Sequence, residues 1–405
     1  MNHFFRRPKT LAQFREAPLG PYLDSYAERL HTEEYSRGSA RQLIRSVAQL
    51  SVWLRERGID AQKVTRQHVE LYPRSRIREV GPALRQFIRH IHPEQFLKEV
   101  TDSQLDTPLE RLKVEFDHHL QYEKGLASST RRDYIRFAHQ FLKTRFPSGQ
   151  VDLACLEAAD VTGFVRSEAA GPWVSRAEHV TFAIRCFLRF AHQRGYLSGK
   201  LAGCVPKVAH WKLASLPNHL LKDQVEQVLA NCNRQTARGK RDFAVLLLLA
   251  RLGLRGGEVA ALTLDNIDWH NGTLTVRGKG DRKAQFPMGH DVGAALADYL
   301  QNGRPRVASR IIFCRALAPA KPLHGQAAIS SIVRGNLQQA GVTSVCQGAH
   351  LFRHTLATEL LRHGASLTEI GEVLRHRSPD TTARYAKVDL DSLRSIVPAW
   401  PGGER

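Results

Sequence analysis

The sequence has no long uninterrupted run of apolar residues. Its apolar runs, such as residues 244–250, are far shorter than the roughly 18 to 20 residues that a membrane-spanning helix needs. The first residues, Met1 to Pro8, also lack the apolar core and small-residue cleavage site of a secretion signal. We therefore expect neither a membrane protein nor a secreted one.

Cysteine and acidic residues are scarce as well. The 405 residues include six cysteines and no Cys-x-x-Cys pair, which excludes a disulfide framework and a zinc module of the usual spacing. Only 39 Asp and Glu oppose 59 Lys and Arg, so the net charge is +20. This excess favours a polyanionic partner, and nucleic acid is a better candidate than an anionic membrane surface. We expect a cytoplasmic protein that is nucleoid-associated when bound to DNA.

The composition is that of a folded chain with several domains. Hydrophobic residues make up 42% and charged residues 24%, which excludes a mostly disordered protein. Breaks in the pattern occur at residues 101–108, which end in a proline, and at the basic stretch 206–217. The breaks predict an N-terminal helical domain over 1–100, a second helical domain over 107–205, a third domain over 218–390 and a tail over 391–405.

The first two segments resemble each other. At an offset of 100, seven of fifteen positions are identical between residues 75–89 and residues 175–189. Residues 43–45 match 134–136 at an offset of 91. Both copies have apolar residues at helical spacing with basic residues between them. The alternative is chance similarity between two basic helices, but we favour a duplicated helical domain.

The third segment begins with a nearly all-apolar helix over residues 241–254 and then changes to strands. His270-Asn271-Gly272 predicts a tight hairpin turn. A second turn places Lys279 between two glycines at a hairpin tip. A lysine there is usually only a solvated residue, although it can reach a neighbouring site as a mobile acid. The remainder, from about 327 to 396, is expected to be helical.

Several polar residues of this segment lie next to apolar runs. Arg255 follows the apolar helix, and Glu258 is three residues further on. Arg255 could merely neutralise a helix C-terminus, or Glu258 could hold it by an ion pair while its other donors face a ligand. His350, Arg353 and His354 have helical spacing. The two histidines also have metal-ligand spacing, but no HExxH glutamate is present and the arginine between them would repel a cation.

Read in order, these motifs resemble the tyrosine recombinase (phage integrase) family. The motifs are Gly-Leu-Arg-Gly-Gly-Glu-Val at 253–259, Gly-Lys-Gly at 278–280, His-Leu-Phe-Arg-His at 350–354, Leu-Arg-His at 374–376 and a tyrosine at 385. The resemblance implies six catalytic residues: Arg255, Lys279, His350, Arg353, His376 and Tyr385. Supporting roles fall to Glu258 and His354. The family commonly has Leu-Gly-His at the fourth motif, so the residue before His376 departs from the pattern.

The resemblance also implies the fold. We expect a mainly α protein with a small antiparallel β-sheet, in which helical N-terminal DNA-binding domains precede an α+β catalytic domain. Residues 107–205 would be the family's helical core-binding (SAM-like) domain and residues 1–100 its duplicate. DNA contacts are expected from Arg131, Arg132, Arg176 and Arg185. Simple members of the family have one helical domain before the catalytic one, whereas this chain has two.

The activity implied is that of a site-specific DNA recombinase of the integrase or transposase type, acting through a 3′-phosphotyrosyl intermediate. No metal or other cofactor is expected. The partner is double-stranded DNA, on which a homo- or hetero-tetramer assembles at paired sites, with accessory or partner recombinases in some systems. The tail over 391–405 would contact a neighbouring protomer.

Two alternative functions are compatible with the same motifs. A type IB topoisomerase-like enzyme performs the same chemistry on a single duplex, and tandem helical domains before the catalytic one favour recombination over it. A catalytically silent, sequence-specific DNA-binding protein could keep the fold, but it has no physical reason to retain both arginines and the tyrosine. The N-terminal copy is interpreted as an additional DNA contact or as a platform for a partner recombinase.

Overall fold

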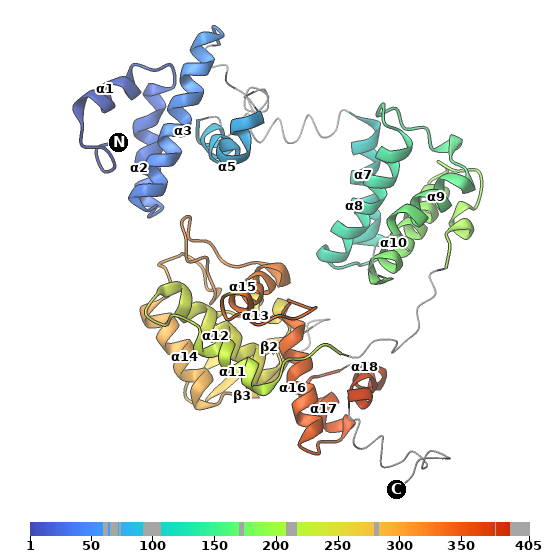
Figure 1. Cartoon of the computed structure of the whole chain (residues 1–405). Coiled ribbons are helices and arrows are strands. Elements are labelled where there is room, and N and C mark those ends of the chain that lie inside the picture. The colour runs from blue at the N-terminus through green and yellow to red at the C-terminus, as the bar shows by residue number, and fades with distance from the viewer. Residues whose placement is uncertain are drawn as a thin grey trace, which may run out of the picture. The chain divides into compact units, whose positions relative to one another are not determined.

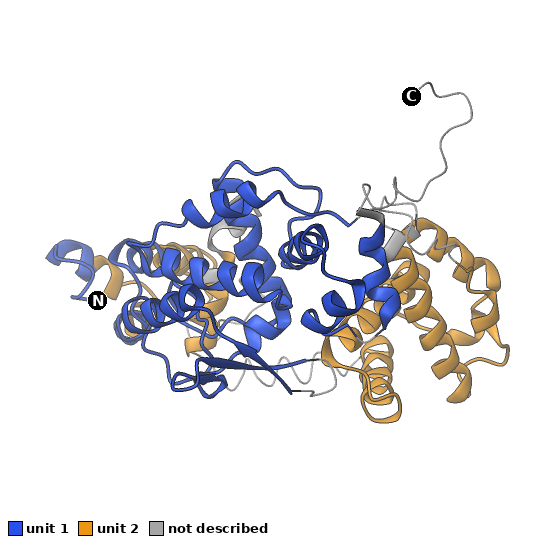
Figure 2. Cartoon of the chain, turned by 90° about the horizontal axis from the view of Figure 1, so that it is seen from below, with its two compact units in different colours: residues 1–12, 23–44, 213–405 blue, residues 13–22, 45–212 orange. Residues whose placement is uncertain are grey.

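A computed structural model of the chain describes residues 1–59, 64, 72, 74–91, 107–169, 174–207, 217–278, 283–376 and 378–388. The described part is mostly helical with one small three-stranded antiparallel sheet (Figure 1), as the sequence predicts. Two compact units are distinguished in Figure 2. One contains residues 1–12, 23–44 and 213–405, and the other contains residues 13–22 and 45–212. The domain boundaries inferred from the sequence stay a prediction.

The N-terminal part of the chain is helical. Its helices are α1 (Pro8–Arg15), α2 (Gly20–Thr32), α3 (Arg37–Glu56) and α5 (Arg74–Ile91). In α3, Ile44, Val47, Leu50 and Leu54 are completely buried. Their spacing of three or four residues places them on one face of the helix, which explains why this basic segment is helical.

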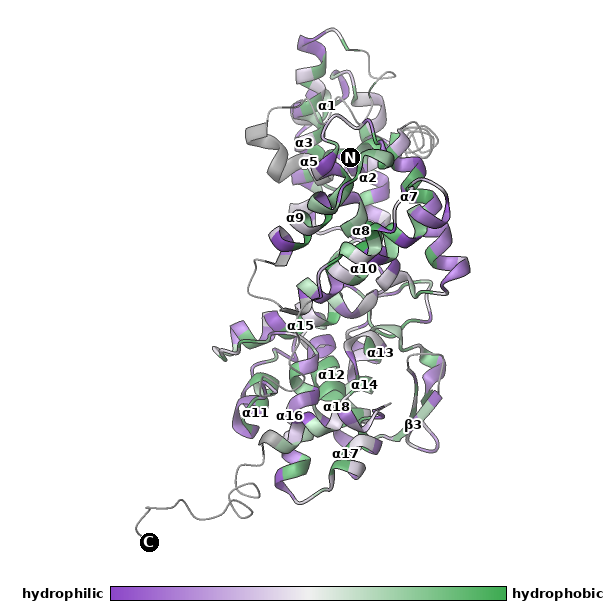
Figure 3. Cartoon of the chain, turned by 90° about the vertical axis from the view of Figure 1, so that its right-hand side faces the viewer, coloured by the Kyte–Doolittle hydropathy of each residue, from purple (hydrophilic) through white to green (hydrophobic). Residues whose placement is uncertain are grey.

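Residues 107–207 form a second group of helices. Its elements are α7 (Pro108–His118), a π-helical turn (His119–Glu123), α8 (Ser128–Arg145), α9 (Ala158–Ala169), α10 (Val174–Gln193) and two 3-10 turns (Leu153–Cys155 and Leu201–Cys204). Thr107 caps α7 by accepting a hydrogen bond from the Glu110 N–H at 3.2 Å, and Pro108 is the first residue of the helix. Helices α7, α8 and α10 carry both hydrophobic and hydrophilic residues (Figure 3). Their buried residues, such as Phe116 and Phe187 with ring centroids 5.3 Å apart, form the core.

The two helical segments have matching helix positions. Helix α3 begins at Arg37 and α8 at Ser128, while α5 begins at Arg74 and α10 at Val174. These starts differ by the offsets of 91 and 100 that the sequence repeat shows. The agreement supports the duplication, which stays a prediction.

The C-terminal part is built around one central apolar helix. The helices are α11 (Lys222–Ala230), α12 (Ala237–Leu252), α13 (Gly256–Ala261), α14 (His290–Asn302), α15 (Gly325–Gln339), α16 (His350–Arg362), α17 (Leu367–Val373) and α18 (Pro379–Ala383), with 3-10 turns η5 (Leu264–Asn266) and η6 (Arg384–Val388). Helix α12 packs against α11, α13, α14, α15 and α16. Residues 244–249 of α12 are all buried. The apolar run in the sequence is therefore the centre of this core.

The sheet lies beside these helices. Its strands, β1 (Ile267–Asp268), β2 (Thr273–Arg277) and β3 (Lys283–Pro287), pair in the order β1-β2-β3. The turn predicted at His270-Asn271-Gly272 joins β1 to β2, and Gly272 adopts a φ of +60°. Asp268 Oδ1 accepts hydrogen bonds from the N–H groups of His270 and Asn271 at 3.1 and 3.0 Å. The second predicted turn is residues 278–281, and all of it except Gly278 lies outside the described residues.

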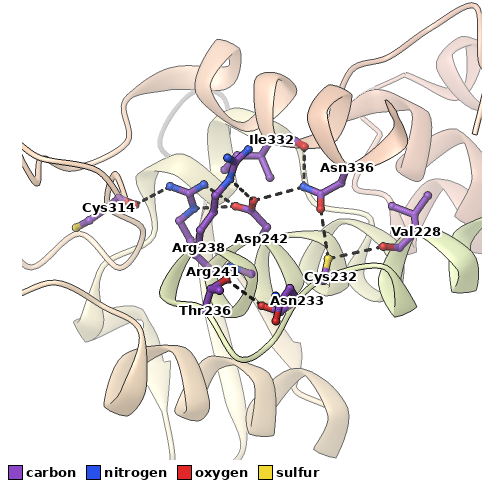
Figure 4. Close-up of polar contacts among 11 residues, drawn as sticks. Val228, Cys232, Asn233, Thr236, Arg238, Arg241, Asp242, Cys314, Ile332 and Asn336 are labelled. Atoms are coloured by element: carbon purple, nitrogen blue, oxygen red, sulfur yellow. Dashed lines mark hydrogen bonds and ion pairs between the residues drawn. The ribbon is translucent and has the colours of Figure 1, made fainter. Parts of the chain in front are cut away.

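A buried polar network ties α12 to its neighbours (Figure 4). Asp242, 3% exposed, accepts hydrogen bonds at Oδ1 from Nε and Nη2 of Arg241 at 2.8 and 2.6 Å. Arg241 also donates to the Cys314 carbonyl oxygen at 3.2 Å, and Asn336 of α15 donates to Asp242 Oδ2 at 3.5 Å. The thiol of Cys232, which lies just after α11, donates to Asn336 Oδ1 at 3.4 Å. Each charge is thus paired inside the core, as burial requires.

Candidate active site

Arg255 follows the central helix at a tight glycine turn. Gly253 ends α12 with a φ of +57°, and a Cβ at this position would lie 2.9 Å from the side chains of Leu356 and Leu374. The chain then turns into α13, for which Arg255 is the N-cap residue. Both the backbone conformation and the close packing therefore require glycine here.

Glu258 fixes the position of Arg255. Its Oε2 accepts a hydrogen bond from the Arg255 backbone N–H, and its Oε1 accepts one from Arg255 Nη1, both at 2.9 Å. Of the two interpretations offered by the sequence, the ion pair between Arg255 and Glu258 is the one present. Burial alone raises the pKa of the Glu258 carboxyl, but the backbone hydrogen bond from Arg255 and the charge of Arg375 outweigh burial and lower it. Glu258 consequently remains ionised, while Arg255 keeps about a third of its side chain exposed.

Arg353 is a buried cation that connects two segments of the site. Its side chain lies on α16 and is 3% exposed. Nη1 donates to the carbonyl oxygen of Gly253 at 2.6 Å, and Nη2 donates to that of Leu374. Burial, followed by repulsion from Arg255, lowers the pKa of Arg353 to about 10. The guanidinium therefore stays protonated at neutral pH and holds the end of α12 to the end of α17.

Tyr385, on η6, is buried between two histidines. Its hydroxyl lies 2.7 Å from His354 Nδ1, and its ring is nearly parallel to that of His376 at an angle of 9°. Burial raises the pKa of Tyr385, and the charges of Arg353 and Arg384 offset part of that rise. Burial, with repulsion from His350, lowers the pKa of His354 to about 4. His354 is therefore neutral at pH 7.

His376 and His350 complete the group. His376 Nδ1 lies 2.7 Å from Thr382 Oγ1, which orients the ring. Burial and then repulsion from Arg353 lower the pKa of His376 to about 4. Burial also lowers the pKa of His350, followed by repulsion from Arg353. Both imidazoles are therefore neutral at pH 7 and offer hydrogen bonds without adding charge.

The structure brings together five of the six predicted catalytic residues: Arg255, His350, Arg353, His376 and Tyr385. Lys279 lies outside the described residues. Both predicted supporting residues contact the group, Glu258 through Arg255 and His354 through Tyr385.

Sequence reasoning missed two residues that contact this group. Thr382 orients His376, and Arg375 donates from Nη2 to Glu258 Oε2 at 2.8 Å. The signal for Arg375 was present, because an arginine replaces the glycine of the usual Leu-Gly-His motif. A threonine six residues after a histidine gives no comparable signal.

The four arginines expected to bind DNA mostly have partners within the chain. Arg131 pairs with Asp117 at 3.3 Å and Arg176 with Glu168 at 2.6 Å. Arg185 donates to the carbonyl oxygens of residues 205 and 206 at 3.2 and 3.5 Å. Arg132 is exposed, and its Nε donates to the Ser128 carbonyl oxygen at 3.3 Å. Each of the four arginines therefore already contacts a group of this chain.

Comparison with known proteins decides the family. Residues 218–391 match the phage integrase family. The chain is 40% identical over 407 residues to the "Putative integrase/recombinase y4rA" of Sinorhizobium fredii, with 99% of each chain covered. The chain belongs to the phage integrase family. It is therefore a tyrosine recombinase, a site-specific enzyme that breaks and rejoins DNA strands.

Other relatives agree with this assignment. The recombinase is 31% identical over 301 residues to tyrosine recombinase XerD of Mycobacterium tuberculosis, covering 70% of this chain and 94% of XerD. Its fold is similar to that of XerH bound to difH, with a TM-score of 0.52 and 19% identity over 70% of this chain and 84% of XerH. Lambda integrase bound to a core site gives a TM-score of 0.52 at 14% identity, over 68% of this chain and 94% of the integrase chain. These two structures establish the fold of the recombinase.

Among the described residues, no three His, Cys, Asp or Glu side chains lie together in a group that could hold a metal ion. No described helix combines the length and the apolar character needed to cross a membrane.

Proposed function

We propose that Arg255, Lys279, His350, Arg353, His376 and Tyr385 carry the strand cleavage and rejoining of this recombinase. One observation supports this assignment above the others: the Tyr385 hydroxyl lies 2.7 Å from His354 Nδ1, and its ring stacks on His376. Burial raises the pKa of this phenol, and the charge of the buried Arg353 offsets part of that rise. Tyr385 would thus act as a nucleophile beside groups suited to binding phosphate.

The cations would stabilise the transition state. A phosphodiester resists attack because its oxygens are negative, and negative charge grows on the nonbridging oxygens as the nucleophile approaches. Arg255 offers a partly exposed guanidinium, and guanidinium forks bind phosphate oxygens in two places. His350 and His376, neutral at pH 7, would donate hydrogen bonds to the same oxygens. No metal is required for this chemistry.

The covalent step exchanges one ester for another. The Tyr385 oxygen forms a bond to phosphorus while the bond from phosphorus to the 5′ oxygen breaks, which leaves a 3′-phosphotyrosyl link and a free 5′-hydroxyl. His354, whose Nδ1 lies 2.7 Å from the Tyr385 hydroxyl, would take the phenolic proton. Lys279 would supply a proton to the departing 5′ oxygen as general acid. Attack by a 5′-hydroxyl of the partner duplex reverses the step and rejoins the strand.

Double-stranded DNA is the substrate that the family and the net charge of +20 both favour. Four protomers, identical or of two kinds, would pair two duplexes and exchange strands between them. Accessory or partner recombinases would act with them in some systems. Residues 391–405 lie outside the described residues, and we propose that this tail contacts a neighbouring protomer.

A basic cavity in the second group of helices supports a DNA-binding role for residues 107–205. It measures about 720 Å³, and its lining includes Arg185, Arg189, His192, Lys200 and Lys207 but no acidic residue. Such a concentration of positive charge fits a DNA phosphate. We propose that this cavity and Arg131, Arg132 and Arg176 bind the DNA backbone.

Covalent trapping tests the proposed chemistry. The full chain is incubated with a nicked suicide duplex that carries the candidate site from beside the gene, and the products are separated on a denaturing gel. We expect a protein–DNA adduct with the unmodified chain and none with Tyr385→Phe. Loss of the hydroxyl leaves the ring packing in place, so half-site binding should be unchanged.

A different outcome would separate the alternatives. A tight, salt-sensitive complex on a footprinted site, without any adduct, would contradict the assignment of Tyr385 and favour a catalytically silent DNA-binding protein. An adduct that persists in Tyr385→Phe would show that another residue is the nucleophile. Relaxation of supercoiled DNA without paired sites would indicate the topoisomerase-like alternative.

A further inference from the structure

Arg375 occupies a backbone position that favours glycine. It follows α17 with a φ of +54°. Its N–H donates to the Glu372 carbonyl oxygen at 2.9 Å, and the His376 N–H donates to that of Gly371 at 2.8 Å. This pair of hydrogen bonds is the Schellman ending of a helix, in which the left-handed residue is usually glycine. An arginine here adopts an unfavourable backbone conformation, so its side chain is expected to compensate.

The Arg375 side chain turns into the site. It is 19% exposed, and its Nη2 donates to Glu258 Oε2 at 2.8 Å. Its guanidinium carbon lies 4.6 Å from the ring centroid of Phe286 on β3, a cation–π distance. Its Nε is buried and, within the described part of the chain, has no hydrogen-bond partner. Arg375 is therefore clamped between an aromatic ring and a carboxylate.

Glu258 is the point at which two guanidinium groups meet. Its Oε1 accepts from the Arg255 side chain, and its Oε2 is shared by the Arg255 N–H and Arg375. The carboxylate is 6% exposed, so little water is available to replace a lost donor. Removing Arg375 would free one side of Oε2 and allow the carboxylate to rotate. The Arg255 guanidinium would rotate with it.

We propose that Arg375 is a positioning residue of this recombinase, which acts through Glu258 to fix the Arg255 guanidinium for phosphate binding. Phe286 holds Arg375 in the orientation that this requires. The inference rests on the proposed function, because Arg255 is the phosphate-binding group that Arg375 positions. It explains why an arginine replaces glycine at this place.

The test is Arg375→Gly in the full chain. Glycine suits the left-handed backbone, which offsets part of the stability lost with the Arg375–Glu258 ion pair, so the thermal unfolding midpoint should fall less than it does in Glu258→Gln. Adduct formation on the nicked duplex is measured in single turnover at saturating protein, and half-site affinity is measured separately. We expect at least a tenfold slower rate of adduct formation with affinity within twofold of the unmodified chain. A purely structural role would leave that rate unchanged.

Matched variants sharpen the result. Glu34 is exposed and also has a left-handed backbone, with a φ of +56°, so Glu34→Gly relieves the same conformation elsewhere and should leave the rate unchanged. Arg375→Lys keeps the positive charge but loses the planar guanidinium group. We expect an intermediate rate of adduct formation for this variant. In a double variant with Glu258→Gln, loss of Arg375 should add almost nothing to the loss caused by Glu258→Gln alone.

Three results would overturn the inference. A rate for Arg375→Gly within twofold of the unmodified chain would show that Arg255 does not depend on Arg375. Rate losses that multiply in the double variant would show that Arg375 acts independently of Glu258. An unmodified chain that forms no adduct would refute the proposed function itself, and this inference with it.

Discussion

Replacing Glu258 by glutamine removes the charge that neutralises two guanidinium groups. The carboxylate is 6% exposed, and its contacts with Arg255 and Arg375 are 2.9 and 2.8 Å long. Breaking a buried ion pair costs about 3–5 kcal/mol. Arg255 regains some hydration because it is 34% exposed, and the glutamine oxygen still accepts one hydrogen bond. We therefore expect a loss of about 2–4 kcal/mol in the free energy of unfolding.

Calorimetry of the full chain measures this loss. For a domain of about 150–250 residues, each kcal/mol lowers the Tm by about 2–4 °C, so a decrease of about 5–15 °C is expected. Hydrogen–deuterium exchange of peptides from α12 identifies the transition that belongs to the catalytic part. The same variant should slow adduct formation, because the Arg255 guanidinium is no longer held.

Glu226 provides the control for this substitution. Its Oε1 lies 2.9 Å from Arg251 Nη2, the same length as the Glu258–Arg255 pair, but Glu226 is 48% exposed. Exposed pairs contribute about 0–1 kcal/mol, so Glu226→Gln should lower the Tm by at most about 4 °C. A Tm change for Glu258→Gln no larger than that of the control would refute the reasoning. It would show that stability depends no more on the buried charge of Glu258 than on the exposed charge of Glu226.

Three further predictions concern stability. Gly253→Ala places a methyl group 2.9 Å from two leucine side chains at a φ of +57°. It should destabilise the fold by about 1–3 kcal/mol, as measured by calorimetry. The control is Gly364→Ala, because Gly364 also has a positive φ but open space around its Cβ position. Asp242→Ala leaves a buried guanidinium unpaired, and chemical denaturation should show a loss of about 3–5 kcal/mol; a loss under 1 kcal/mol would contradict this. The pKa of both His354 and His376 is lowered to about 4 in the folded chain. On acidification these two histidines are therefore protonated at a higher pH in the unfolded chain than in the folded chain. Stability is then complete above about pH 6.5 and falls toward pH 4, by at most about 3 kcal/mol per histidine; unfolding midpoints that do not change between pH 7 and pH 5 would refute this.

Local signals in the sequence predict much of the catalytic part. The apolar run at 244–250 predicts a buried helix because only a helix surrounded on all sides accommodates it. Asn271-Gly272 predicts a hairpin because these residues tolerate a positive φ. The spacing of Arg255 and Glu258 predicts an ion pair, because residues three apart lie on one side of a helical turn. Each signal lies within a few residues of the structure that it predicts.

Contacts between distant segments have no such local signal. Arg375 and Glu258 are 117 residues apart, and Tyr385 and His354 are 31 apart. Whether they meet depends on how α13, α16 and α17 pack, and no local spacing encodes that packing. The same limit applies to Arg185. Its basic helix predicts a DNA contact, whereas the fold brings the carbonyl oxygens of residues 205 and 206 within its reach.

The geometry of Arg353 shows why stability and chemistry are coupled in this site. Its guanidinium donates to the carbonyl oxygens of Gly253 and Leu374. Gly253 lies two residues before Arg255, and Leu374 lies two residues before His376. One buried side chain therefore sets the distance between Arg255 and His376, the two groups that we propose to bind the phosphate. Since a buried carbonyl without a donor costs about 1–3 kcal/mol, any movement of Arg353 toward a phosphate must leave at least one of these hydrogen bonds intact. The phosphate is accordingly expected to approach the guanidinium through donors that the two carbonyls do not use.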